Sequence, residues 1–141
     1  MIDATLIDRC LSEVADLSRF FEDWFAGATS CEPATFARLP EVLSEDFLLV
    51  TTRGEVLDRD SLLARIRAAH GMASAANGRL EVLVESMRAR CVAPDVCVVT
   101  YEERQVLGGE SVGRIVTALF RGRSGAPNGV EWLHLHEVEQ A

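Results

Sequence analysis

Apolar residues recur at helical spacing through the N-terminal part of the chain, with acidic residues between them. This pattern predicts a long amphipathic helix from Ile2 to about Ala26, which Gly27 is well placed to end. A loop follows, and then a short second helix from about Ala34 to Leu43 that Pro40 shortens or kinks. The apolar stripe of the first helix consists of Leu6, Cys10, Val14, Leu17, Phe21 and Trp24.

The next segment combines a small hairpin with a third helix. Phe47–Thr52 is an apolar, β-prone run, and a turn at residues 53–55 leads to a short return strand around residues 56 and 57. A helix begins near Asp58, whose carboxylate suits a helix N-terminus, and its apolar stripe ends near His70. The Ala/Ser/Asn/Gly-rich connection after it is predicted to be flexible.

The remainder of the chain has the two-residue period of β-strands. Turn-forming residues at 94–95, 108–109 and 122–129 separate four strands and favour an antiparallel meander over parallel βαβ units. We therefore expect one α+β domain over residues 1–141, in which N-terminal helices cover a curved antiparallel sheet. The strands run at about Arg79–Cys91, Val96–Val106, Val112–Arg121 and Val130–Val138.

The third of these strands is apolar on both faces. Ile115 and Leu119 lie on one face, and the other face carries Val112, Val116, Ala118 and Phe120. Helices cover only the concave side of such a sheet, so the opposite side needs a second cover or leaves isolated aliphatic residues exposed. Between these readings we favour a homodimer that forms through the sheet.

Composition narrows the classes of protein. Acidic residues outnumber basic ones by 22 to 14, and this charge balance disfavours nucleic acid and anionic membranes as partners. The apolar runs are too short to cross a bilayer, and the N-terminus lacks a basic region followed by an apolar stretch. We expect a soluble cytoplasmic protein without a cofactor.

The four cysteines contain no CxxC pair, and in a cytoplasmic protein they are expected to be reduced thiols. Burial in the core is the simplest role for each cysteine. Cys91 and Cys97 flank a short turn and can face each other across a hairpin. A disulfide between these two residues under oxidising conditions is the alternative role.

Four motifs carry a family resemblance: Glu45-Asp46-Phe47, Gly54–Arg59, Thr117–Arg121 and Trp132–His136. With the order of helices and strands, they resemble the nuclear transport factor 2-like superfamily over nearly the whole chain, in its SnoaL-like, ketosteroid isomerase-like branch. The resemblance implies a cystatin-like fold with an apolar pocket inside a cone, usually dimeric. Isomerases, cyclases, dehydratases, ligand carriers and association domains all use this fold, so it does not fix a function.

The ketosteroid isomerases of this superfamily use a tyrosine on the first helix, an aspartate base and a protonated aspartate on a later strand. The resemblance places Phe20 at the tyrosine position and Thr51 at the base position, and Val112–Arg121 offers no carboxylate for the third role. It therefore disfavours steroid-type isomerisation. Other chemistry in the pocket requires other groups, namely Tyr101, His134, His136 or Arg114.

Trp132, His134 and His136 alternate with leucines, so in a regular strand their side chains point to one side of the sheet. If that side is the interior, an imidazole can act as general base, or both can bind a metal with a carboxylate such as Glu103. The competing interpretation makes the histidines edge or interface residues that are hydrogen-bonded to neighbours. HxH alone is a weak metal signal, and we expect no metal.

Aromatic residues of the first helix are candidates for the pocket wall. Phe20 and Trp24 share a helix face and are the first choice, with Phe21 and Phe25 as the competing pair. Arg114 and Trp132 are the other predicted ligand-binding residues. Tyr101 shares a strand face with Val99 and Glu103, where it is either a hydroxyl donor in the pocket or a cross-strand aromatic.

The sequence contains no phosphate loop, GxSxG elbow, HExxH helix or EF-hand spacing. Our leading hypothesis is a dimeric protein that binds a small, mostly apolar molecule, with cofactor-free acid/base chemistry through His134, His136 or Tyr101. The alternative is a non-catalytic association domain.

Overall fold

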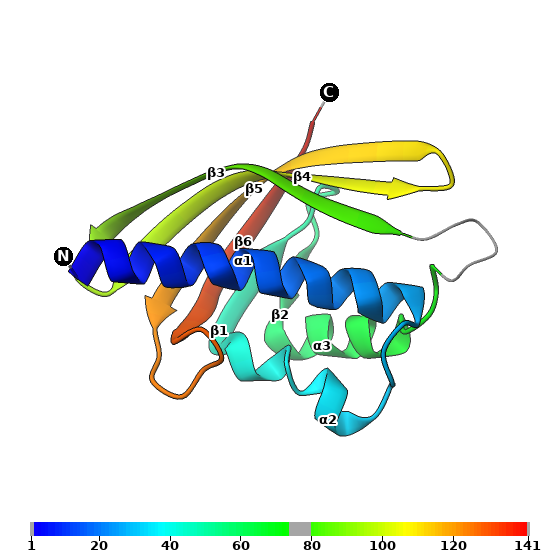
Figure 1. Ribbon diagram of the computed structural model, residues 1–141, viewed down its shortest axis with the longest axis horizontal. Coiled ribbons are helices and arrows are strands. Elements are labelled where there is room, and N and C mark those ends of the chain that lie inside the picture. Colours follow the sequence, from blue (N-terminus) through cyan, green and yellow to red (C-terminus); the bar gives the residue numbers. More distant parts are fainter. Residues whose placement is uncertain (1, 74–79, 141) are drawn as a thin grey trace.

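The computed structural model describes residues 2–73 and 80–140, which form helices packed on one curved sheet (Figure 1). The connection that the sequence predicts to be flexible falls largely at residues 74–79, outside the described residues. The helices are α1 (Ile2–Ala26), α2 (Pro33–Phe36), the 3-10 helix η1 (Pro40–Val42) and α3 (Arg59–Ala68). The strands are β1 (Leu43–Val50), β2 (Val56–Asp58), β3 (Glu81–Ala93), β4 (Val96–Leu107), β5 (Glu110–Gly122) and β6 (Val130–Glu139).

The strands pair in the order β2-β1-β6-β5-β4-β3. Strands β3 to β6 form the predicted antiparallel meander, and β1 and β2 form the predicted hairpin. Strand β1, however, runs parallel to β6. The meander begins with β3 at the edge of the sheet farthest from the hairpin, and its last strand, β6, therefore lies beside β1 and runs in the same direction. The sheet is therefore mixed, while the α+β, cystatin-like fold is confirmed.

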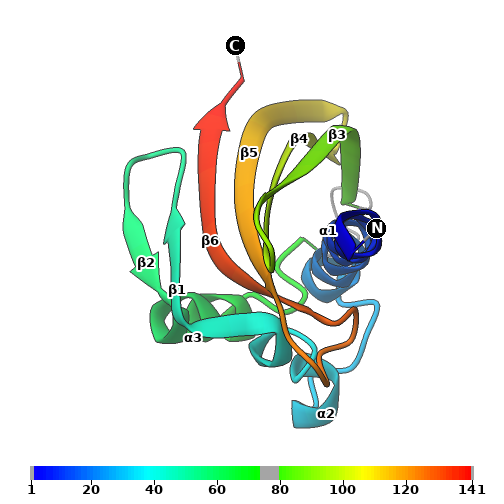
Figure 2. The same ribbon diagram turned by 90° about the vertical axis from the view of Figure 1, so that its left-hand side faces the viewer.

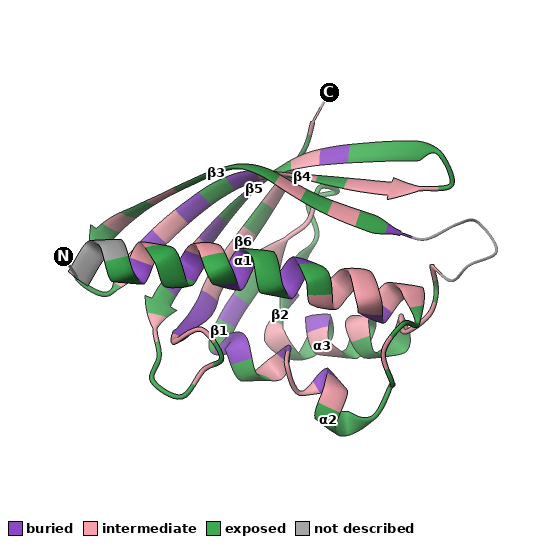
Figure 3. Cartoon of the chain, in the orientation of Figure 1, coloured by how far each residue is buried: buried purple, intermediate pink, exposed green. Residues whose placement is uncertain are grey.

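Helix α1 lies lengthwise over the concave face of the sheet, as two views at right angles show (Figures 1 and 2). Its bounds match the sequence prediction, and its buried side contains the predicted apolar stripe except Phe21, which is half-buried (Figure 3). Gly27 follows the helix with a φ of +70°, a conformation that favours glycine. A Cβ atom there would lie 3.3 Å from the Cα atom of Gly71, so the close approach of the two segments also favours a glycine.

The segment between α1 and the hairpin differs from the prediction. Instead of one kinked helix over 34–43, the chain forms α2 and then η1, which begins at Pro40. Strand β1 begins at Leu43, four residues before the predicted start at Phe47. Helix α3 begins as predicted: the Asp58 carboxylate accepts a hydrogen bond of 2.8 Å from the Ser61 amide.

A β-bulge interrupts β6 and determines which of its side chains face the helices. Leu119 of β5 pairs with His134, whereas the next residue, Phe120, pairs with Trp132, so Leu133 is an extra residue in β6. Beyond this bulge the alternation of side chains is shifted by one residue. The expectation that Trp132, His134 and His136 share one side of the sheet is therefore wrong.

Before the bulge, a buried carboxylate links α1 to the indole of Trp132. Glu13 is fully buried, and its Oε2 atom accepts a hydrogen bond of 2.9 Å from Trp132 Nε1. Its Oε1 atom accepts from Arg38 Nη2 at 2.8 Å and from Asn128 Nδ2 at 3.0 Å. Both carboxylate oxygens are thus satisfied, which a buried charge requires. Glu13 connects the first helix, the segment after α2, the β5–β6 connection and the last strand.

We expect Glu13→Ala to lower the free energy of unfolding by about 3 kcal/mol, because it leaves the half-buried Arg38 guanidinium and the buried Trp132 indole without their acceptor. Urea unfolding followed by tryptophan fluorescence measures this. Asp16→Ala is the matched control, since Asp16 shares the Asn128 partner but is exposed. Equal small losses for the two variants would contradict a structural role for the buried carboxylate.

Candidate functional site

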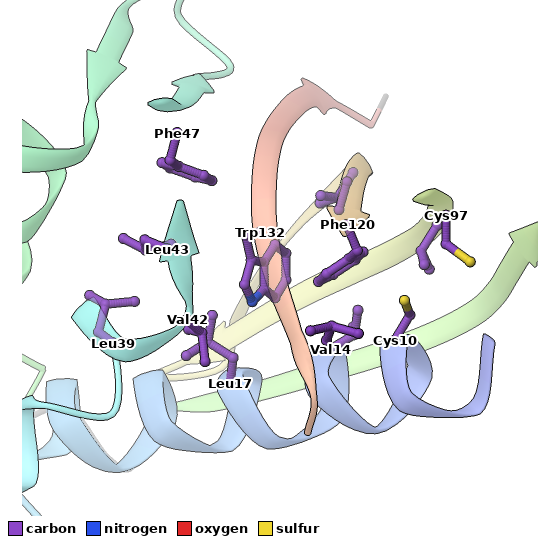
Figure 4. Packing of buried hydrophobic residues seen from close by; sticks show 14 of the residues in the cluster. Cys10, Val14, Leu17, Leu39, Val42, Leu43, Phe47, Cys97, Phe120 and Trp132 are labelled. Carbon is purple, nitrogen blue, oxygen red and sulfur yellow. The ribbon is translucent and has the colours of Figure 1, made fainter. Parts of the chain in front are cut away.

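A cavity of about 210 Å³ lies between the concave face of the sheet and the helices. Most of its wall is apolar, and the wall includes side chains from α1, α3 and five strands, β1, β3, β4, β5 and β6. Phe21 and Phe25 of α1 stack on each other with ring centroids 5.8 Å apart and contribute one side of the wall. Figure 4 shows how Phe47, Leu43 and Leu17 gather around Trp132. The apolar wall includes Leu17, Phe21, Phe25, Leu43, Phe47, Leu49, Ile66, Trp132 and Leu135.

One end of the cavity is polar because three charged side chains meet there. Arg114 lies between two carboxylates: its Nη1 atom is 3.0 Å from Glu137 Oε2, and its Nε atom is 3.5 Å from Glu103 Oε2. The Glu103 and Glu137 side chains are only 12% and 16% exposed. Gln105 also donates to Glu103 Oε2 at 3.4 Å. One guanidinium thus serves two nearly buried carboxyl groups.

Strand register explains why these groups meet. Glu103 and Arg114 are directly opposite each other on β4 and β5, where cross-strand side chains touch. Glu137 of β6 pairs with Val116, two residues beyond Arg114, and reaches the guanidinium diagonally. Tyr101 lies two residues before Glu103 on the same strand and lines the same cavity. The polar end is therefore built on β4, β5 and β6, the last three strands of the meander.

Burial sets the protonation of this polar end. Burial raises the pKa of Glu103, and the neighbouring Glu137 carboxylate adds to the increase while Arg114 opposes it. Burial also raises the pKa of the Tyr101 phenol well above its ordinary range, with a further contribution from both carboxylates. Tyr101 is thus a protonated donor at neutral pH, and Glu103 holds its proton to a higher pH than an exposed glutamate does.

The structure brings some of the predicted site residues to the cavity. Tyr101, Arg114 and Trp132 line it, together with Phe21 and Phe25, the pair that the sequence offered as second choice. Trp24 instead stacks on Phe20 at 5.7 Å and donates its indole hydrogen to the Ile66 carbonyl at 2.6 Å. Neither of these two side chains lines the cavity.

The histidines of the last strand lie on the other side of the sheet. Past the bulge, Leu135 and Glu137 face the cavity, whereas His134 is opposite Leu119 and His136 is opposite the exposed Thr117 on the outer face. Thr51, at the base position of the isomerase resemblance, accepts amide hydrogen bonds within the β1–β2 turn. The predicted candidates therefore do not form one cluster.

Sequence reasoning missed two groups of the polar end. The sequence suggests Glu103 only as a metal ligand, although its place on the same strand face as Val99 and Tyr101 indicates that it points inward. Glu137 carried no such signal, because its direction depends on the bulge. No three metal-ligating side chains converge in the part of the chain that the structure describes.

A second, more open cavity of about 380 Å³ lies near the start of β1 and contains Arg59, Arg121 and Arg123. Its guanidinium groups already have partners. Arg121 donates twice to Glu131, and the other two arginines donate to backbone carbonyls. The apolar cavity with its polar end is therefore the stronger candidate for a ligand.

The helix-covered curved sheet with an internal cavity is the NTF2-like fold, which solved structures share. The chain belongs to the family described as the sucrose-6-phosphate phosphohydrolase C-terminal family, whose model matches residues 11–141. Comparison with curated proteins gives no match.

Three solved structures illustrate the likeness. An NTF2-like protein of unknown function from Pseudomonas aeruginosa is 22% identical, with a TM-score of 0.82 over 94% of this chain and 99% of that chain. An uncharacterised cystatin-like protein from Caulobacter vibrioides is 15% identical, with a TM-score of 0.71 over 95% and 89%. The CaMKII hub of S. rosetta is 8% identical, with a TM-score of 0.69 over 95% and 96%. At these identities the likeness shows the fold alone.

The raised pKa of Glu103 predicts a stability change in Glu103→Gln. Because this pKa is higher in the folded protein than in the unfolded chain, the folded protein loses stability as the pH rises from the ordinary value of 4.5 through the folded value. Glutamine mimics the protonated carboxyl, so we expect the variant to have a higher Tm than the parent at pH 8 and a similar Tm below pH 4.5.

Thermal unfolding across this pH range measures the change in Tm. For a domain of this size, a change of 1 kcal/mol in the free energy of unfolding shifts Tm by about 2–4 °C. Glu102→Gln is the matched control, because hydrogen bonds with Gln140, which donates, and with Ser86 lower the pKa of the half-buried Glu102. This control should gain nothing at pH 8. A lower Tm for Glu103→Gln at pH 8 would mean that the ion pair with Arg114 outweighs the cost of burial.

Proposed function

We propose that this protein binds a small, mostly apolar molecule in the cavity and catalyses cofactor-free proton transfer on it, with Glu103 as the general acid/base. The observation that carries the proposal is a nearly buried carboxyl with a raised pKa at the polar end of an apolar cavity. Perturbed carboxyl groups in such places are the usual participants in proton transfer. Neither His134 nor His136 lines the cavity, so we give the role to Glu103.

The two ends of the cavity support different parts of this function. The aromatic and aliphatic wall suits the body of an apolar ligand, because each Å² of apolar surface that it covers contributes about 25 cal/mol. At the polar end, ionised Glu103 takes a proton from a carbon next to a carbonyl group. The neutral Tyr101 phenol is suited to donate a hydrogen bond to the oxygen on which negative charge develops.

Arg114 tunes the base in this scheme. Its guanidinium favours the ionised form of Glu103, and burial and Glu137 favour the protonated form. These opposing effects allow the carboxyl both to accept and to return a proton during one reaction cycle. Two carboxylates against one guanidinium also make the polar end unfavourable for an anionic ligand, so the proposed ligand is neutral at that end.

Hydrogen–deuterium exchange into an apolar cyclic ketone tests the proposal. With the ketone in D2O, we expect the parent protein to give saturable exchange at the carbon next to the carbonyl, measured by proton NMR. Glu103→Gln should reduce the rate by about 100-fold or more, because it removes the base. A carboxylate analogue of the ketone should inhibit more weakly than an alcohol of the same shape.

Glu102→Gln is again the matched control, since Glu102 lies on the outer face beside Glu103 and should leave the exchange rate unchanged. Exchange that does not exceed the buffer rate across a panel of ring sizes, or that survives in Glu103→Gln, would refute proton transfer by this carboxyl.

A second candidate function is association through the outer face of the sheet. Ile115 and Val138 pair on this face and are 40% and 55% exposed, and Leu48 on β1 is 39% exposed. Apolar side chains on an otherwise uncovered sheet face support contact with a second copy of the chain. The similarity to a structure described as a CaMKII hub also favours oligomerisation. Here His134 and His136 become interface residues.

Ile115→Glu should dissociate such a homodimer, because it places a charge at the centre of the apolar face. Analytical ultracentrifugation at micromolar concentration should show a dimer for the parent and a monomer for the variant. Ser12→Glu, an equal charge change at an exposed position of α1, should stay dimeric. A monomeric parent protein would remove the association function.

A further inference from the structure

Two cysteine thiols face each other across the β3–β4 hairpin. Cys91 and Cys97 are direct partners in the antiparallel ladder, and their Sγ atoms lie 2.9 Å apart. Antiparallel partners have Cα atoms about 4.5–5.5 Å apart, which lies within the range that a disulfide spans. A disulfide bond is about 2.0 Å long, so bond formation needs less than about 1 Å of sulfur movement.

The surroundings make the two sulfur atoms unequal. Cys97 is fully buried, whereas Cys91 is half-buried on β3, the edge strand of the sheet. A small oxidant therefore reaches Cys91 first. Burial raises the pKa of the Cys97 thiol well above its ordinary value, so Cys97 stays protonated until a partner sulfur becomes electrophilic.

A third thiol closes the inner side of the pair. Cys10 of α1 is fully buried, and its side chain points from the helix toward β4 (Figure 4). It shares a hydrogen bond with Cys97, and burial raises its pKa to about 11. The fourth cysteine, Cys31, is exposed in the segment between α1 and α2. The pair thus opens to solvent only on the Cys91 side.

We propose that Cys91 and Cys97 are an oxidation site, at which a peroxide converts the two thiols into an intrachain disulfide. The Cys91 sulfur attacks one peroxide oxygen, and the O–O bond breaks to give a sulfenic acid and one water molecule from hydrogen peroxide. The Cys97 sulfur then attacks the Cys91 sulfur; the hydroxyl group leaves with the Cys97 proton as a second water molecule. Two thiols and one peroxide become one disulfide and two waters, so atoms and electrons balance.

Peptide mass mapping tests the site directly. Cleavage after arginine leaves both cysteines on the peptide 91–104, whereas Cys10 and Cys31 fall on other peptides. After treatment of the folded protein with hydrogen peroxide and alkylation in denaturant, we expect this peptide to lose two hydrogen atoms and to take up no alkyl group. Dithiothreitol should restore both alkylation sites. Cys31→Ser, the matched control, should behave like the parent, and Cys91→Ser should give no intrachain cross-link.

A second measurement tests whether the folded structure favours the disulfide, or whether the two cysteines form it only because they are close in the sequence. The protein is equilibrated in a series of buffers that differ in the ratio of reduced to oxidised glutathione. The folded protein should keep the disulfide at a ratio at least ~10-fold more reducing than the ratio at which the urea-unfolded chain loses it, because folding holds the two sulfur atoms together. Equal ratios for the two states would overturn the proposal. So would a Cys10–Cys97 bond, a cross-link through Cys31, or further oxidation of Cys91 without a bond to Cys97.

Discussion

The extra residue Leu133 in β6 is the constraint on which the cavity depends. Because a strand alternates its side chains between two faces, one inserted residue exchanges the two faces for the rest of the strand. Trp132, before the bulge, and Leu135 and Glu137, after it, thereby all face the helices. The hydrogen bond from Trp132 to the buried Glu13 fixes the strand just before the bulge. Without this shift, histidines would replace a leucine and a glutamate in the cavity.

The bulge also shapes the electrostatics of the cavity. It brings Glu137 to Arg114, which Glu103 already faces from the opposite strand, so one cation is shared between two acids. Burial raises the pKa of Glu103; the shared arginine opposes the increase, and the second carboxylate adds to it. The same displacement moves His134 and His136 to the outer face among exposed aliphatic residues. A single backbone irregularity therefore separates the proposed chemical function from the proposed association surface.

Much of the fold was predictable from periodicity. The bounds of α1 and the meander strands follow from apolar spacing and turn residues, and the sequence also identifies Tyr101 and Arg114 as residues of the cavity. The bulge was not predictable, because Trp132–His136 fits regular alternation as well as a shifted one. The pair of aromatic residues that lines the cavity depends on how α1 is rotated about its own axis, which the sequence does not show. The hydrogen bond from Trp24 to the Ile66 carbonyl helps to fix this rotation, so that Phe21 and Phe25 face the cavity.

No helix within residues 2–73 and 80–140 combines the length and apolar character needed to cross a bilayer. The parallel pairing of β1 with β6 affects the order in which the chain folds. Strand β1 is complete at Val50, yet its neighbour in the centre of the sheet begins at Val130. During synthesis, the β1–β2 hairpin must wait for almost the entire chain before it can join the sheet. Such a distant contact slows folding, because the entropy of closing a long loop is lost before the pairing is formed. A chain that stops short of β6 lacks the strand that joins the hairpin to the meander.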